Sequence, residues 1–156
     1  MMAFPFWNWT IDMSLAMSKA EREVFLADLH VGVVSVNRKA EGPLSAPIWY
    51  MYEDGLVWFS TGAESLKGRL MNVGDRISMV AQTEQPPYQY VSVEGPIVAR
   101  EGMDVERDIK PMAIRYLGEE MGTSYAEGSA GEGSVVIRMK PEKWLTVDYS
   151  KQFANT

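Results

Sequence analysis

Three short runs rich in β-branched and aromatic residues follow one another between residues 31 and 61, and they constrain the fold more than any other feature of the chain. They read VGVVSVNR, LSAPIWYMYE and LVWFST, and turn residues separate them. The second turn contains Asp54-Gly55, and Asp-Gly between two such runs is a strong signal for a tight β-hairpin. The segment therefore predicts three antiparallel strands in a meander.

The rest of the chain predicts four more strands and few helices. The additional strands cover residues 76–83, 88–99, 134–139 and 144–149, with a bulge or bend at Gly95-Pro96. A helix is expected over residues 18–29, where Ser18 and Glu21 have capping-box spacing, and a short helix within residues 62–72. A third helix is expected over residues 103–117, started or interrupted by Pro111, and then a mobile loop over residues 118–133.

Seven strands joined mostly by short connections favour a mainly β protein with a closed or half-closed antiparallel barrel. A length of 156 residues suits one domain, expected over residues 18–150. Residues 1–17 carry four large aromatic side chains and are interpreted as an arm that packs on the domain or on a partner subunit, with a lid over a ligand as the alternative. Residues 151–156 form a short tail.

Composition removes several classes of chemistry. The chain has no cysteine and one histidine, His30. Thiolate catalysis, zinc–thiolate sites, iron–sulfur clusters and sites built from several histidines are therefore excluded. His30 is expected at the end of the first helix, where it is interpreted as a residue that interacts with the helix dipole and not as a catalytic group. No spacing of carboxylates or other ligands indicates a metal site.

Charge and hydropathy indicate the surroundings of the protein. The net charge of −6 argues against broad binding to nucleic acid. No apolar run approaches the ~18 residues that a membrane span needs. No Lys or Arg precedes Lys19, so the basic start of a signal peptide is missing. We therefore expect a cytoplasmic protein without nucleic-acid or membrane partners.

One stretch carries a signal for ligand binding. The sequence FSTGAESLKGR, residues 59–69, ends a strand and opens a helix, and it gathers three hydroxyl side chains and two cations: Ser60, Thr61, Ser65, Lys67 and Arg69. Backbone N–H groups at a helix start and nearby cations favour an anion, and hydroxyls add donors. The pattern predicts a phosphate site, and a Ser helix cap that happens to be followed by Lys is the plainer alternative.

These segments, in this order and with these gaps, resemble the pyridoxamine 5′-phosphate oxidase-like split β-barrel proteins, also called the flavin/deazaflavin oxidoreductases. The resemblance covers roughly residues 18–149 and rests on a helix ending in FLADL followed by VGVVSV, SAPIWYMYEDG, LVWFST, SLKGRL, RISMVAQ and YVSVEG. It implies a split antiparallel β-barrel of the FMN-binding type. It also implies a homodimer with the cofactor at the subunit interface.

The resemblance assigns residues to the cofactor and to the substrate. The cofactor phosphate would be held by Thr61, Ser65, Lys67 and Arg69, and the ribityl chain by Ser60. The backbone of Ala46, Pro47, Ile48 and Trp49 would run along the ring. The substrate pocket would include Tyr50, Tyr88 and Tyr90. Because the cofactor performs the redox step, no catalytic side chain is assigned.

Departures from the family pattern limit the chemistry. Leu66 stands where the oxidases at the root of the family have an arginine that pairs with the phosphate. Tyr90 stands in place of a glutamine, and Tyr50 in place of a substrate-side lysine. These differences argue against oxidation of pyridoxamine phosphate itself.

The resemblance implies an oxidoreductase that transfers a hydride between a bound cofactor and an unknown small organic substrate. The cofactor is FMN or the deazaflavin coenzyme F-420, with a slight preference for F-420. Its longer acidic tail needs extra cations, and Lys67, Arg69 and Arg76 are expected to form a small basic cluster. The alternatives are a non-catalytic carrier or sensor of the same cofactor, and an interaction module that uses the acidic segment 101–132.

Overall fold

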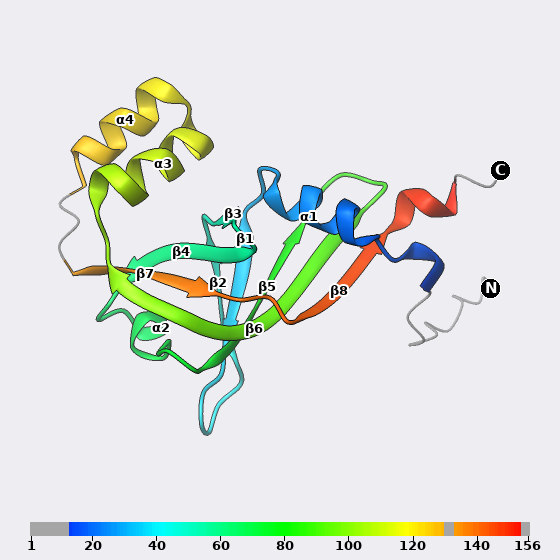
Figure 1. Cartoon of the computed structure of the whole chain (residues 1–156), viewed down its shortest axis with the longest axis horizontal. Helices are drawn as coiled ribbons and strands as arrows, with labels where there is room; N and C mark the ends of the chain where they lie inside the picture. The colour runs from blue at the N-terminus through cyan, green and yellow to red at the C-terminus, as the bar shows by residue number, and fades with distance from the viewer. Residues whose placement is uncertain (1–12, 130–132, 154–156) are drawn as a thin grey trace, which may run out of the picture.

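A curled antiparallel sheet forms the centre of the computed structural model, which describes residues 13–129 and 133–153. Within those residues it has eight strands: β1 (Gly32–Val36), β2 (Leu44–Ile48), β3 (Met51–Glu53), β4 (Leu56–Gly62), β5 (Arg76–Gln82), β6 (Gln89–Gly102), β7 (Ser134–Met139) and β8 (Lys143–Asp148). The strand order is β2-β1-β5-β6-β7-β4-β3, and β8 pairs with β6 (Figure 1). The predicted split antiparallel barrel is confirmed.

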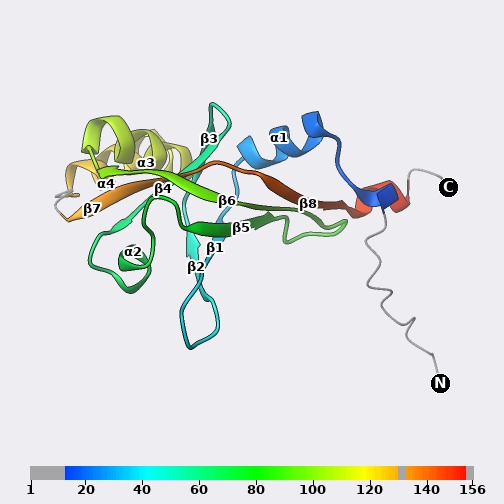
Figure 2. The same cartoon turned by 60° about the horizontal axis from the view of Figure 1, so that its bottom comes forward.

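Strand β6 joins the two halves of the barrel. Its first part pairs with β5 and β8, and its second part, from Ile97 to Gly102, pairs with β7 (Figure 2). The register shifts between Ile97 and Ala99, shortly after the bend predicted at Gly95-Pro96. A Cβ on Gly95 would lie 1.8 Å from the carbonyl oxygen of Lys140. Glycine is therefore required where the β7–β8 connection crosses β6.

The core lies inside the barrel and is closed by helix α1 (Lys19–Ala27). The predicted capping box is present, because the Glu21 N–H donates to Ser18 Oγ at 3.1 Å and the Ser18 N–H donates to Glu21 Oε1 at 3.4 Å. The helix buries Phe25 and Leu26 against alternate residues of β1, β4 and β5. Those residues are Val34, Val36, Val57, Phe59, Ile77 and Met79.

The single strand predicted over residues 44–53 is wrong, because the chain leaves the sheet at Trp49 and Tyr50 and resumes as β3. The hydroxyl of Tyr116 lies at this break. It accepts a hydrogen bond from the Tyr50 N–H at 3.1 Å and donates to the carbonyl oxygen of His30 at 2.5 Å. The Tyr116 side chain, distant in sequence, therefore accepts the backbone hydrogen bond that a neighbouring strand would otherwise accept from Tyr50.

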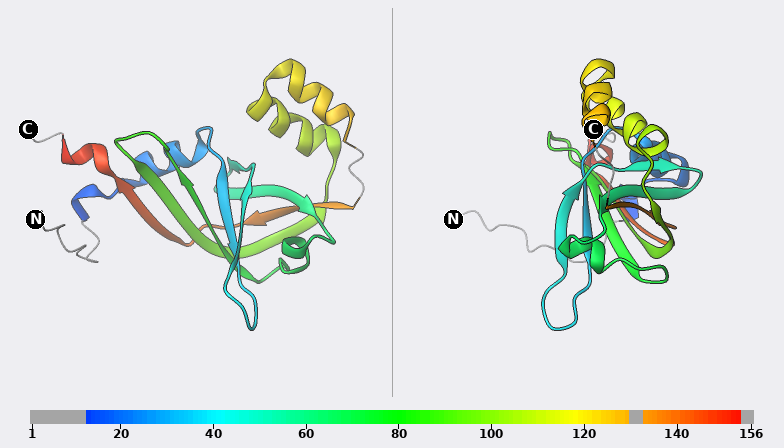
Figure 3. Two further views of the ribbon diagram at one scale, coloured as in Figure 1. Left: turned by 180° about the vertical axis from the view of Figure 1, so that it is seen from behind. Right: turned by 90° about the vertical axis from the view of Figure 1, so that its left-hand side faces the viewer.

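The mobile loop predicted over residues 118–133 is also wrong for its first part. A π-helical turn, η2 (Val105–Ile109), leads into α3 (Lys110–Leu117), and α4 (Glu119–Glu127) folds back on α3. A Cβ on Gly122 would lie 2.5 Å from the Cα of Ile114, so glycine lets the two helices touch. This close packing stabilises a polar helix. The pair stands beyond the ends of β4 and β7 (Figure 3).

The two ends of the described chain lie side by side. The short turns η1 (Met13–Leu15) and η3 (Tyr149–Gln152) are in contact, and Lys151 Nζ donates to the carbonyl oxygen of Ala16 at 2.9 Å (Figure 1). The aromatic residues of the predicted arm, Phe4, Phe6, Trp7 and Trp9, fall outside the described residues, as do residues 154–156 of the tail. In the part of the chain that is described, no helix has the length and apolar character needed to cross a membrane. The remaining helix, α2 (Leu66–Arg69), belongs to the site.

Candidate functional site

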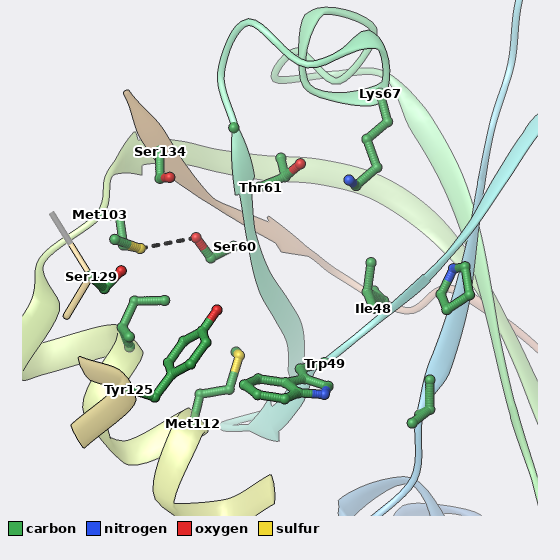
Figure 4. A pocket seen from close by; sticks show the side chains of 14 residues that line it. Ile48, Trp49, Ser60, Thr61, Lys67, Met103, Met112, Tyr125, Ser129 and Ser134 are labelled. Carbon is green, nitrogen blue, oxygen red and sulfur yellow. Dashed lines mark hydrogen bonds between the residues drawn. The ribbon is translucent and has the colours of Figure 1, made fainter. Parts of the chain in front are cut away.

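A cavity of about 430 Å³ lies between β2, the end of β4 and the α3–α4 pair (Figure 4). This volume is in the usual range of small-molecule sites. Six of the nine residues predicted to hold the cofactor line it: Pro47, Ile48, Trp49, Ser60, Thr61 and Lys67. The other lining residues are Val31, Gly62, Met103, Ile109, Met112, Tyr125, Ser129 and Ser134. The structure therefore brings together residues from two of the predicted segments.

Hydroxyl groups form the polar end of the cavity. Thr61 is only 6% exposed, and its Oγ1 lies 3.3 Å from Ser65 Oγ, within hydrogen-bond distance. Ser65 caps α2, since its Oγ accepts from the Gly68 N–H at 3.1 Å and donates to the Gly62 carbonyl oxygen at 2.7 Å. Ser65 is not among the residues that line the cavity. Its hydroxyl shapes the loop instead, and Thr61 is the residue of this pair that lines the cavity.

Lys67 gives the cavity a positive charge. Its ammonium group points into the cavity near Thr61 (Figure 4). Of the lining residues that the structure describes, Lys67 is the charged one, and none is a carboxylate. Within residues 13–129 and 133–153, no ion pair joins Lys67 to an acid. An unpaired cation beside a hydroxyl is suited to an anionic group such as a phosphate.

The basic cluster predicted from Lys67, Arg69 and Arg76 does not form. Arg76 makes ion pairs with Glu94 at 3.3 Å and with Glu142 at 2.6 Å on the outer surface. Both carboxylates raise its pKa, the Glu142 hydrogen bond most. Arg69 is exposed and does not line the cavity. Strand β5 places Arg76 next to Glu94 of β6 and Glu142 of the β7–β8 connection, and these acids neutralise it.

The side chain of Arg100 supports the loop at the polar end of the cavity, and no pattern in the sequence indicated it. The guanidinium of this β6 residue donates to the carbonyl oxygens of Gly68 and, at 2.7 Å, of Met71, and it lies 3.5 Å from that of Ala63. One rigid, multivalent cation therefore holds both ends of the loop that carries Lys67. Only a known register of β6 against β7 would have placed it there.

Aromatic side chains form the other end of the cavity. Trp49 stacks on Tyr116 with ring centres 5.0 Å apart and a 6° angle between planes. Tyr125 lies against the same indole at 5.5 Å and 53°. Burial raises the pKa of Tyr116, whose hydroxyl is tied to the backbone of His30 and Tyr50. Tyr125 was not predicted as a site residue because α4 was interpreted as a loop.

The predicted substrate-pocket tyrosines lie elsewhere. Tyr50 is 1% exposed, and its hydroxyl donates to the Leu26 carbonyl oxygen at 2.7 Å. Burial raises its pKa well above the ordinary value, and Tyr50 does not line this cavity. Tyr88 and Tyr90 lie near the start of β6, at the opposite end of the strand from the cavity, and Ala46 does not line the cavity either.

His30 is also outside the cavity. It lies past the last residue of α1 and stacks on Phe25 with ring centres 4.3 Å apart. Its Nε2 is buried and has no hydrogen-bond partner among the described residues. Burial lowers its pKa, with Asp28 acting in the opposite direction.

The sequence was compared with models of known protein families and with curated proteins. The sequence model of the pyridoxamine 5′-phosphate oxidase family matches residues 18–148. Among the curated proteins, none matches this sequence significantly.

Solved structures share the fold. A conserved hypothetical protein from Mycobacterium tuberculosis is 20% identical with a TM-score of 0.74, over 90% of this chain and 91% of that chain. An FAD-binding protein from Mesorhizobium loti is 18% identical with a TM-score of 0.57, over 84% of this chain and 94% of that chain. An F-420 reductase is 18% identical with a TM-score of 0.57, over 79% of this chain and 94% of that chain.

Proposed function

The chain belongs to the pyridoxamine 5′-phosphate oxidase family, and we propose that it is an oxidoreductase that transfers a hydride between a flavin-type cofactor and a small organic substrate. The observation that carries the proposal is the polar end of the cavity, where Lys67 and Thr61 face the interior and the described part of the lining contains no carboxylate. A phosphate group fits this donor set because it needs a cation and hydroxyl donors. The proposed cofactor is FMN or coenzyme F-420, since both carry a phosphate.

The structural relatives support the choice of cofactor. One of them is an F-420 reductase and another is an FAD-binding protein. The pairing of Arg76 with Glu94 and Glu142 leaves Arg69 as the nearest additional cation for an acidic tail in the segment that carries Lys67. The preference for F-420 therefore has less support than the sequence alone suggested, and FMN is an equal candidate.

The residues that line the cavity would bind the cofactor and orient it. When bound, a flavin or deazaflavin ring supplies the hydride chemistry, so that no catalytic side chain is required. Lys67 and Thr61 would hold the phosphate, and Ser60 would contact the adjoining chain. The backbone from Pro47 to Trp49 forms one wall, and Ile109 and Met112 from the helical region exclude water on the far side.

We further propose that two copies pair beside this cavity. An open groove of about 840 Å³ on the outer side of β1 and β5 shares Val31 and Pro47 with the cavity. Its lining includes Leu29 and Val31, which are 49% and 54% exposed. Apolar side chains gathered beside a ligand site favour a second subunit there. Sedimentation of the cofactor-loaded protein should give a dimer.

The test uses titration of the cofactor-free protein with FMN, with riboflavin and with coenzyme F-420. Riboflavin has the ring of FMN and lacks the phosphate. Replacing Lys67→Ala should weaken FMN binding by at least ~1.5 kcal/mol, about tenfold, and should leave riboflavin binding unchanged. Lys39→Ala, on the loop between β1 and β2, is the matched control and should change neither affinity.

The outcomes separate the possible functions. Equal FMN affinity in wild type and Lys67→Ala would reject the phosphate assignment. Binding of a cofactor that is then never oxidised or reduced, with any reductant or acceptor, would favour the carrier or sensor. Failure to bind FMN and F-420 alike would reject the oxidoreductase.

A further inference from the structure

The cavity has two chemically different ends. Lys67 and Thr61 lie at one end, and the side chains of Trp49, Met112 and Tyr125 form a wall at the other (Figure 4). If the phosphate of the cofactor takes the polar end, as proposed above, the side chains of Trp49 and Tyr125 are left without an assigned role. The composition of the wall indicates what it can bind.

The wall is held in place before any ligand arrives. The indole of Trp49 is stacked on Tyr116 at a 6° angle between planes. The hydroxyl of Tyr116 is fixed between the Tyr50 N–H and the His30 carbonyl oxygen. A ring that is already ordered loses little entropy when a second ring stacks on it. Flat molecules therefore gain more from this wall than flexible or puckered ones.

The polar features of the wall are hydroxyl groups. The phenol of Tyr125 points into the cavity, and Ser129 lies beside it (Figure 4). Within the described residues, the Tyr125 hydroxyl has no hydrogen bond, and the residue is 51% exposed. A phenol in this position offers one donor and one acceptor. Among the described residues that line the cavity, none is a carboxylate that would attract a cation, and Lys67 repels one.

We propose that the aromatic wall is the substrate subsite, that it takes planar uncharged aromatic molecules with one polar substituent, and that Tyr125 determines this specificity. The proposal rests on the proposed function, because it requires the cofactor to occupy the Lys67 end. The substrate ring stacks beside Trp49, and its substituent hydrogen-bonds to the Tyr125 hydroxyl. Saturated ring systems and organic cations are poor ligands.

The test measures binding of three probes by calorimetry to the cofactor-loaded protein: 2-naphthol, its saturated analogue decahydro-2-naphthol, and the cation of 2-(aminomethyl)naphthalene. We expect 2-naphthol to bind about tenfold more tightly than the other two. Tyr125→Leu should weaken 2-naphthol about tenfold, and Tyr125→Phe a few-fold through the lost hydrogen bond. Tyr88→Leu is the matched control, since Tyr88 is also 51% exposed and does not line the cavity.

Three results overturn the proposal: equal binding of the planar and saturated probes, unchanged 2-naphthol affinity in Tyr125→Leu, or release of the cofactor by 2-naphthol. The last result would mean that the wall holds the ring of the cofactor. Failure of the proposed function has a different signature, because no cofactor then binds at all. In that case the same probes are titrated into the cofactor-free protein, and a preference for 2-naphthol that depends on Tyr125 still supports the aromatic subsite.

Discussion

Replacing Gly68 by alanine, in the loop that carries Lys67, has two opposite effects on the free energy of unfolding. Alanine favours the helix, but its Cβ clashes with the backbone. Gly68 lies in helix α2, where alanine is ordinarily better than glycine by about 1 kcal/mol. A Cβ at this position would lie 2.0 Å from the carbonyl oxygen and 3.0 Å from the carbonyl carbon of Gly62. Since the first contact is backbone, no side-chain rotation relieves it, and α2 must move by more than about 1 Å.

The clash is expected to prevail. Overpacking of this kind costs about 1–3 kcal/mol. The displacement also stretches the bond from Ser65 Oγ to the Gly62 carbonyl and the bond from Arg100 to the Gly68 carbonyl, each worth about 1 kcal/mol. After the helix gain is subtracted, Gly68→Ala should lower the free energy of unfolding by about 2–4 kcal/mol. Because Lys67 moves with the helix, FMN binding should weaken about tenfold or more.

Urea unfolding with a constant slope measures the first effect, and FMN titration the second. Gly42→Ala is the control, because a Cβ there meets no atom within 4 Å and the substitution should be nearly neutral. If Gly68→Ala proves as stable as wild type or more stable, with unchanged FMN affinity, the loop is not held by close packing and the reasoning about Lys67 fails with it.

Three further substitutions and titrations test other contacts. Arg100→Met should lower the free energy of unfolding by about 1–3 kcal/mol, measured in urea, because buried carbonyls lose their donor, and Arg100→Lys should restore only part of it. Tyr116→Phe should lower the melting temperature, because the Tyr50 N–H loses its partner; an unchanged value would contradict the bridging role. The one imidazole signal in NMR should titrate below its ordinary pKa of 6.5, because burial of His30 disfavours the charged form. The unfolded chain then binds the proton more readily, so stability is present above pH 6.5 and falls as the pH drops through the folded pKa, and a measured pKa at or above 6.5 would refute this.

Much of the barrel could be predicted because its strands are short runs of β-branched and aromatic residues, and β1, β5 and the first part of β6 alternate between buried and less buried positions. The strand at Ser134–Met139 was predicted with its observed bounds, and the capping box of Ser18 and Glu21 is present. The family resemblance drawn from seven ordered segments is confirmed by the match over residues 18–148. In each case a local pattern of side chains and the observed packing agree.

The parts that could not be predicted depend on contacts between distant residues. Helix α4 has a polar, glycine-containing sequence, and it forms because Gly122 allows contact with Ile114. The break after β2 depends on the Tyr116 hydroxyl, and the basic cluster failed because β5 places Arg76 between two glutamates. For the same reason Met112 and Tyr125 of the aromatic wall, and Arg100, were not predicted. Their positions follow from how α3, α4 and β6 pack, which no short window of sequence contains.

The order of strands has a consequence for how the protein is made. Strand β4 carries Ser60 and Thr61, and its neighbours in the sheet are β3 and β7. Since Thr61 pairs with Val135, a chain emerging from the ribosome holds its first four strands without their partner until β7 has been synthesised. Buried residues such as Val57 and Phe59 stay exposed for that time, which makes slow folding and aggregation the risks of this topology. A nascent chain that ends before β7 therefore cannot contain the ligand cavity, although it already carries Ser60, Thr61 and Lys67.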